Sequence, residues 1–254
     1  AGFRCDGLTA SPLTGPAGEF EERSVHFTPE DGGARWDDDL RLTTEGVHHL
    51  HARAGTLESL SNTCQVRPAD TTLPSRYWGD LHGQTGQTVG TGSLDEYFTF
   101  GRNKAFLDFT GWQGNDFQIT PDLWREVNEA IQRHHEPGRF VTFPGYEWSG
   151  LSPAGGDHNI YFKGDEGALH RSSHWQVDDD TDLATDRYPI SELWREFEGR
   201  TDVMGVAHVG GRHANLDFLD ERFVPVIEVH SHHGTFEWMI TDALRRNLRV
   251  GFIC

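Results

Sequence analysis

From Tyr77 onward, short apolar runs alternate with segments whose apolar positions follow a helical spacing. The runs are rich in β-branched and aromatic residues and are bounded by turn residues, a pattern typical of buried strands. Seven runs predict strands: RYWGDLHG (76–83), AFLDFTGW (105–112), RFVTFPGYEW (139–148), HNIYFKG (158–164), VMGVAHVG (203–210), VPVIEVHS (224–231) and LRVGFIC (248–254).

Helix start and stop signals lie between these runs. Ser93 and Glu96 have the spacing of a capping box, which predicts a helix that begins after Ser93. Thr120 is placed to cap a second helix, with Pro121 in its first turn, and Pro137 with Gly138 ends it. Two further helices are expected in the segments 191–197 and 236–247.

Strands that alternate with helices predict an α/β fold, here a parallel, barrel-like architecture over residues 76–254. Residues 1–75 differ, because they keep no helical spacing and contain short alternating runs such as GVHHLHARAG (46–55) and NTCQVRP (62–68). We expect a small all-β segment there, either a domain or part of one. Because the chain stops at Cys254, inside or just after the seventh predicted strand, we expect a barrel truncated at its C-terminus.

Composition narrows the classes of function. The 254 residues carry a formal net charge of −18, which argues against binding to a nucleic-acid backbone. No apolar run approaches the roughly 18 residues of a membrane span, and the start AGFRCDGLTA lacks the features of a signal peptide. We expect a soluble chain, with a cytoplasmic location favoured. The three cysteines show no CxxC spacing and indicate neither a disulfide framework nor a zinc knuckle.

Nitrogen- and oxygen-bearing side chains gather at the ends of the predicted strands, where the loops of a β/α barrel converge. A lone histidine is usually structural, but crowded imidazoles repel one another once protonated, unless a cation or a carboxylate compensates. Imidazole together with carboxylate suits Zn, Mn or Fe, so this pattern predicts a divalent metal site. The side chains concerned are Asp80, His82, Gln84, Gln113, Asn115, Asp116, Glu147, Asp157, His158, His208, His230, His232 and His233.

Five of these segments, in order, resemble the polymerase-and-histidinol-phosphatase (PHP) superfamily, and most of all its branch with an N-terminal β-domain. The similarity covers about residues 76–254. It implies a distorted seven-stranded (β/α) barrel, up to three divalent metal ions and hydrolysis of phosphate esters. The segments are YWGDLHGQT, FPGYEW, GGDHNIYF, GVAHVGG and IEVHSHHG.

By position, the resemblance implies the metal ligands His82, Gln84, Glu147, His158, His208 and His230. Glu147 would bridge metals, and His233 is the alternative to His230. Three departures point to fewer metals or a different one, because amide carbonyls are weaker donors than imidazole. Gln84 stands where a second histidine is usual, WQGND replaces a Thr-Asp-His sequence, and a closing Asp-x-His motif is absent from this chain.

The leading hypothesis is a metal-dependent hydrolase, above all a phosphoesterase, with one to three divalent ions and a small anionic phosphate-containing substrate. Asp116 or His233 would accept a proton, and Arg212 would bind the anion. Two alternatives stay open: a degenerate, non-catalytic barrel that binds a metal or ligand, and a metallohydrolase that cleaves C–N or C–O bonds. The sequence leaves the oligomeric state undetermined.

Overall fold

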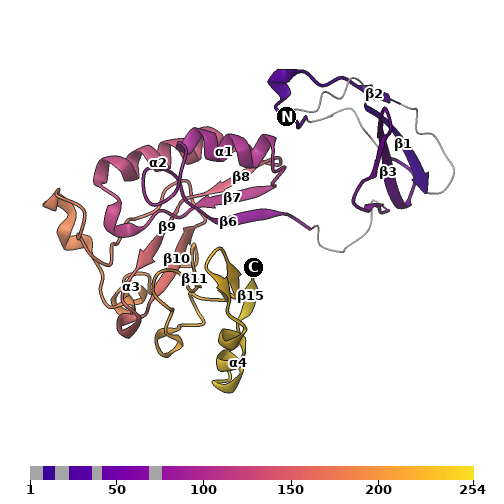
Figure 1. The fold of residues 1–254 in the computed structure, drawn as a ribbon. Helices are drawn as coiled ribbons and strands as arrows, with labels where there is room; N and C mark the ends of the chain where they lie inside the picture. Colours follow the sequence, from indigo (N-terminus) through magenta and orange to yellow (C-terminus); the bar gives the residue numbers. More distant parts are fainter. Residues whose placement is uncertain (1–7, 15–22, 36–41, 69–75) are drawn as a thin grey trace. The chain divides into compact units, whose positions relative to one another are not determined.

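The computed structural model describes residues 8–14, 23–35, 42–68 and 76–254, and the chain divides into two compact units, 1–76 and 77–254 (Figure 1). In the described part of the chain, none of the helices is long and apolar enough to span a membrane.

The first unit contains an antiparallel sheet with the strand order β2-β1-β3-β4, in which β5 also pairs with β3. The alternating runs noted in the sequence lie in this sheet. Gly55 forms the tight turn between β3 and β4 with a φ of 60°, a conformation that favours glycine. The strands are β1 (Leu8–Thr14), β2 (Arg23–Val25), β3 (Gly46–Ala54), β4 (Leu57–Leu60) and β5 (Cys64–Val66), with a short 3-10 turn, η1 (Pro29–Asp31).

The second unit begins with a three-stranded parallel sheet, β6 (Gly79–Gly83), β7 (Phe109–Trp112) and β8 (Val141–Phe143). Helices α1 (Leu94–Asn103) and α2 (Pro121–His134) connect these strands and cover one face of the sheet (Figure 1). Both predicted helix starts are confirmed. Ser93 and Glu96 form the capping box, and the Thr120 hydroxyl accepts a hydrogen bond from the Leu123 amide.

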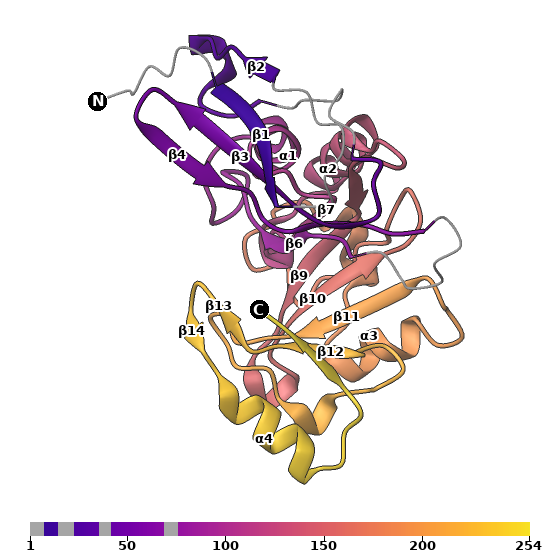
Figure 2. The ribbon, with the colours of Figure 1, turned by 90° about the vertical axis from the view of Figure 1, so that its right-hand side faces the viewer.

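A second, mixed sheet follows, with the strand order β15-β12-β11-β10-β9 (Figure 2). Strand β10 is antiparallel to both of its neighbours, while β11, β12 and β15 are parallel. The elements are β9 (Gly145–Ser149), β10 (Asp157–Phe162), α3 (Ile190–Glu196), β11 (Val203–Ala207), β12 (Val226–Glu228), the hairpin β13 (His230–Ser231) and β14 (Gly234–Thr235), α4 (Glu237–Arg245) and β15 (Gly251–Ile253). Short 3-10 turns are η2 (Asp116–Gln118), η3 (Ser152–Ala154), η4 (Asp180–Thr185) and η5 (Leu216–Phe218).

The predicted seven-stranded (β/α) barrel is wrong. The fold is α/β, but its strands form separate mixed and parallel sheets, and those of the described residues do not close into a barrel. Pro144 splits the run 139–148 into β8 and β9, because proline has no N–H to donate to a sheet ladder. Only residues 150–156 connect β9 to β10, and a parallel crossover needs a dozen residues or more, so β10 runs antiparallel.

The register of the mixed sheet decides which side chains share a face, because partners directly opposite each other point the same way. Glu147 pairs with Asn159, whereas Trp148 pairs with His158. His158 in turn pairs with Ala207, so the next residue, His208, points to the opposite face from His158. The side chains of Glu147, Asn159 and His208 therefore lie on the same face of the sheet.

Several contacts join the two sheets, among them two hydrogen bonds to backbone carbonyls. The amide of Glu147 donates to the carbonyl of Gly114 at 2.9 Å, within an isolated bridge between Asn115 and Glu147. The hydroxyl of the buried Tyr161, in β10, donates to the carbonyl of Leu81, in β6. Since β10 and β6 belong to different sheets, the tyrosine ties them together across the interior.

Tyr161→Phe should lower the free energy of unfolding by about 1–2 kcal/mol, because it leaves the Leu81 carbonyl without its donor while keeping the ring. Urea unfolding followed by tryptophan fluorescence measures the change. Tyr188→Phe is the matched control, since Tyr188 is half exposed, and it should change the stability by less than about 0.5 kcal/mol. Equal effects of the two substitutions would contradict the link.

Candidate metal centre

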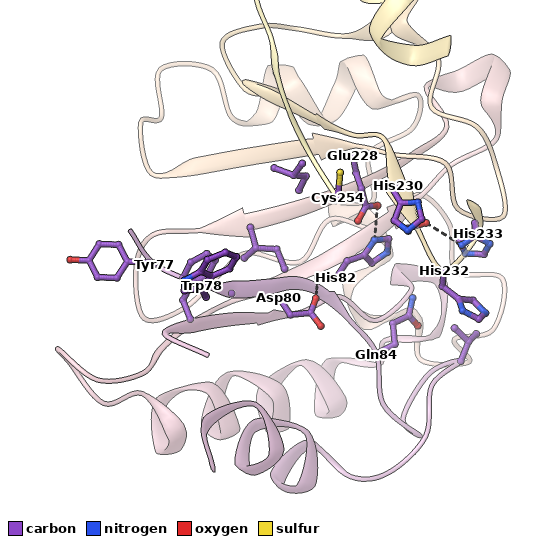
Figure 3. A pocket seen from close by; sticks show the side chains of 16 residues that line it. Tyr77, Trp78, Asp80, His82, Gln84, Glu228, His230, His232, His233 and Cys254 are labelled. Carbon is purple, nitrogen blue, oxygen red and sulfur yellow. Dashed lines mark hydrogen bonds and ion pairs between the residues drawn. The ribbon is translucent and has the colours of Figure 1, made fainter. Parts of the chain in front are cut away.

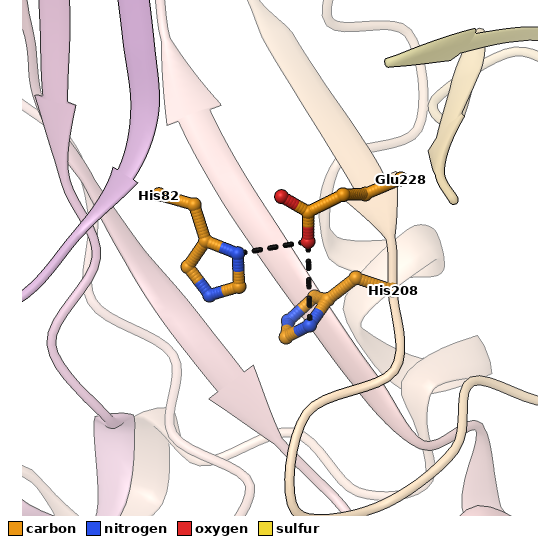
Figure 4. A group of neighbouring side chains, drawn as sticks. All are labelled: His82, His208 and Glu228. Carbon is orange, nitrogen blue, oxygen red and sulfur yellow. Dashed lines mark hydrogen bonds and ion pairs between the residues drawn. The ribbon is translucent and has the colours of Figure 1, made fainter. Parts of the chain in front are cut away.

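Four side chains from four different strands converge inside the second unit. His82 lies on β6, Glu147 on β9 and Glu228 at the end of β12, while His208 directly follows β11. The parallel register of Ala207 with Ile227 turns His208 and Glu228 to the same face. His82, His208 and Glu228 each offer a ligand atom, and these atoms lie within 4.8 Å of one another (Figure 4).

The distances describe a compact cluster. His82 Nδ1 lies 2.9 Å from Glu228 Oε2, and His82 Nε2 lies 3.8 Å from Glu147 Oε2. His208 Nδ1 lies 3.9 Å from Glu228 Oε2, and His208 Nε2 lies 4.0 Å from Glu147 Oε1. The two imidazole centroids are 4.4 Å apart with an interplanar angle of 72°. Each carboxylate therefore faces both imidazoles.

His208 is the least satisfied member of the cluster. Its side chain is fully buried, and neither ring nitrogen has a hydrogen-bond partner among the described residues. Burial, followed by the positive charge of His82, holds the pKa of His208 well below its usual range. A neutral, buried imidazole whose nitrogens have no partner costs stability unless something binds it, and neutral imidazole is a common metal ligand.

His82 has the opposite electrostatic surroundings. Burial disfavours its charged form, but the carboxylates of Glu147 and Glu228 outweigh burial and raise the pKa of His82 to about 10. A proton on His82 thus compensates the two carboxylates in the protein without metal. Since metal ligands must be deprotonated, a divalent cation would displace this proton and take over the same compensation.

Gln84 and Arg212 surround Glu147 without completing the cluster. The Gln84 amide nitrogen donates to Glu147 Oε2 at 2.9 Å, while its carbonyl accepts from the Thr88 hydroxyl at 3.0 Å. Arg212 Nη2 lies 3.8 Å from Glu147 Oε1, and Arg212 Nε donates to Asp157 Oδ1 at 2.6 Å. Both side chains therefore present N–H groups to carboxylates in this structure.

Two predicted site residues point elsewhere. His158 lies on the other face of the sheet, where its Nδ1 is 3.0 Å from the Gly156 carbonyl and its ring centroid is 5.7 Å from that of Trp194. Asp116 is fully buried, and its two oxygens accept backbone N–H groups of Phe117 and Ser172. Burial raises the pKa of Asp116 to about 7, but its lone pairs are engaged in holding the loops together.

A cavity of about 930 Å³ opens beside the cluster (Figure 3). His230 and His233 line it together with His82, and the His230 Nδ1 atom lies 2.7 Å from the Thr235 hydroxyl. The far end of the cavity is formed by Tyr77 and Trp78, both of which are exposed. The remaining wall consists of Gly79, Asp80, Leu81, Gln84, Val89, Phe109, Glu228, Ser231, His232, Ile253 and Cys254.

Sequence reasoning missed Glu228, although it lies in the segment IEVHSHHG. Glu228 stands two residues before His230, between Ile227 and Val229 in an otherwise apolar run. An acidic side chain in a buried strand is rare unless it is paired, and that rule could have identified it.

Residues 100–213 match the family described as "Protein of unknown function (DUF3604)", a match that spans less than half of the chain. Uncharacterized proteins of Chlamydia pneumoniae and Chlamydia muridarum are 18% and 19% identical over 89% of the chain, which spans 39% of their length. The crystal structure of a "putative metal-dependent phosphoesterase" from Bifidobacterium adolescentis is 14% identical, with a TM-score of 0.45, over 71% of this chain and 87% of that one.

Because His158 is buried on the face of the sheet opposite the cluster, we expect it to make the stability depend on pH but to play no part in metal binding. Burial lowers the pKa of His158 to about 4, whereas unfolded histidine takes up a proton near 6.5. The native state therefore loses stability as the pH falls from about 6.5 to 4, by about 3 kcal/mol for this one group. In His158→Phe this part of the acid dependence should vanish, which urea unfolding at a series of pH values measures.

The metal content of the same variant tests which face His158 occupies. We expect His158→Phe to retain the metal content of the wild type, while the matched change His208→Phe empties the site. Elemental analysis of the desalted proteins gives both numbers. Loss of metal in His158→Phe with intact folding would show that His158 is a ligand.

Proposed function

We propose that the second unit is a metal-dependent hydrolase centred on a divalent cation bound by His82, His208 and Glu228, with Glu147 as a fourth ligand. The observation that carries this proposal is that the imidazoles of His82 and His208 and the carboxylates of Glu147 and Glu228 lie close together. The buried ring nitrogens of His208 have no hydrogen-bond partner in the described residues.

The donor set fits a metal. Two imidazole nitrogens and two carboxylate oxygens suit Zn, Mn or Fe. Ligands bound to one ion at about 2.1 Å lie roughly 3–4 Å from one another. His208 Nδ1 is 3.9 Å from Glu228 Oε2, His208 Nε2 is 4.0 Å from Glu147 Oε1, and His82 Nε2 is 3.8 Å from Glu147 Oε2, so each pair has about this separation. The two carboxylates face different nitrogens of His208, and a single ion would bind only one of these nitrogens.

A bound divalent cation would supply Lewis acidity and would generate hydroxide near neutral pH. The chain's own residues do the rest. Glu228 holds the His82 ring through Nδ1 at 2.9 Å, Glu147 faces Nε2 of both imidazoles, and burial of the cluster keeps bulk water away from it. His233 lies in the wall of the cavity, beside His82, and we assign it the role of proton acceptor in place of Asp116, whose oxygens are engaged.

The substrate that we propose is a small, anionic, phosphate-containing molecule. A cavity of about 930 Å³ has the size of a small-molecule site, and His230, His232 and His233 bring N–H donors to the end near the cluster. These histidines, and not Arg212, would bind the anion, because Arg212 already pairs with Asp157. The net charge of −18 disfavours nucleic acid as the substrate.

Glu228→Gln should weaken metal binding by about 10- to 100-fold or more and abolish hydrolysis, because the amide removes one anionic oxygen from the cluster. Isothermal titration with Mn and Zn measures the affinity. Glu237→Gln is the matched control, since Glu237 is exposed at the start of α4, and it should bind metal like the wild type. Unchanged affinity in Glu228→Gln would remove this residue from the site.

A substrate panel decides the reaction class. We expect turnover of phosphomonoesters or phosphodiesters by the metal-loaded wild type, and none by Glu228→Gln. Hydrolysis of amides or C–O esters alone would keep the metal centre and change the bond that is cleaved. Metal binding without turnover of any substrate would favour a non-catalytic binding module.

A further inference from the structure

We propose that Arg212 is a built-in cation that takes the place of a second metal ion between Asp157 and Glu147, so that this site holds a single divalent ion. The inference rests on the proposed metal site and goes beyond it, because it fixes the number of ions and names the residue that sets this number.

The contacts of Arg212 carry the first step. Its Nε donates to Asp157 Oδ1 at 2.6 Å, its main-chain amide donates to Asp157 Oδ2 at 2.8 Å, and its Nη2 lies 3.8 Å from Glu147 Oε1. Asp157 is fully buried and Glu147 nearly so. A positive charge thus lies between two buried carboxylates, the position that a second divalent cation would need.

The chain holds Arg212 in this position from several sides. The loop after β11 folds back on itself, with an isolated bridge between Val209 and His213, and the Asp157 amide donates to the Arg212 carbonyl at 3.4 Å. The Phe117 ring lies below the guanidinium, 5.5 Å from its carbon. Gly210 permits the approach, because a Cβ there would lie 2.5 Å from Asp157 Oδ2.

The balance of charge favours one ion. Glu147, Asp157 and Glu228 are three buried carboxylates, and Arg212 offsets one of them. With both imidazoles neutral, one divalent cation brings the formal charge of the cluster to zero. A second ion would leave an excess of positive charge in a buried site, which is costly.

Gln84 also favours a single ion, because it occupies the second carboxylate oxygen of Glu147. Its amide N–H donates to Oε2 at 2.9 Å, so Glu147 has an N–H donor at Oε2 and a guanidinium near Oε1. Since a carboxylate offers about four lone-pair sites, Glu147 can still bind one cation on the side of His82 and His208. Bridging two cations would require Arg212 to leave.

The test counts ions in the full chain. The wild type, equilibrated with excess Mn(II) and desalted, should hold about one ion per chain by elemental analysis and show the sextet of an isolated Mn(II) in electron paramagnetic resonance. Arg212→Met removes the charge while keeping most of the stem, and it should take up a second ion, whose signal broadens through coupling to the first. Arg212→Lys, which keeps a cation, should stay at one ion.

The outcomes separate the two proposals. A wild type without any ion would overturn the proposed metal site and this inference with it. Two ions in the wild type, or a single ion in a folded Arg212→Met, would overturn the inference alone. Circular dichroism checks folding, and Arg212→Gln, with the same expected second ion, replaces the methionine variant if that variant unfolds.

Discussion

The second unit depends on the compensation of carboxylates that are buried together. Glu147, Asp157 and Glu228 come from three strands of one sheet, and three such charges at close range are costly unless cations compensate them or a carboxylate takes up a proton. Arg212 meets Asp157 directly, and His82 meets Glu228 at 2.9 Å. The register of the sheet and the loop after β11 bring these opposite charges into contact, so the geometry of the cluster depends on this electrostatic balance.

The site could be anticipated from strand ends but not from residue type alone. His82, Glu147 and His208 follow or end apolar runs, and the structure brings them together within 4.0 Å. His158 satisfies the same criterion and points away, because its register with Trp148 and Ala207 places it on the opposite face. A shift of one residue reverses the face of a strand side chain, and the sequence of an isolated strand contains no information about register.

In the fold, too, features set by neighbouring residues could be predicted from the sequence, whereas features set by distant parts of the chain could not. Helix starts depend on contacts over three residues, so the capping signals of Ser93 and Thr120 predicted α1 and α2 correctly. Strand direction depends on how far the chain must travel between strands, and the apolar runs alone concealed the break at Pro144 and the short connection 150–156. Seven apolar runs suggest a barrel, but the lengths of the connections between the strands decide the topology.

A guanidinium and a metal ion can both compensate the charge of a buried carboxylate, but they differ in exchange with solvent and in the ligands that they can take up. Arg212 is covalently part of the chain, keeps its charge at every physiological pH and directs two N–H groups at the carboxylate of Asp157. A metal ion exchanges and offers open coordination positions to a substrate. The chain pairs Arg212 with Asp157, whereas the ring nitrogens of His208 have no hydrogen-bond partner in the described part of the chain. Glu147 lies between the two groups, with Arg212 Nη2 3.8 Å from its Oε1 and His82 Nε2 3.8 Å from its Oε2.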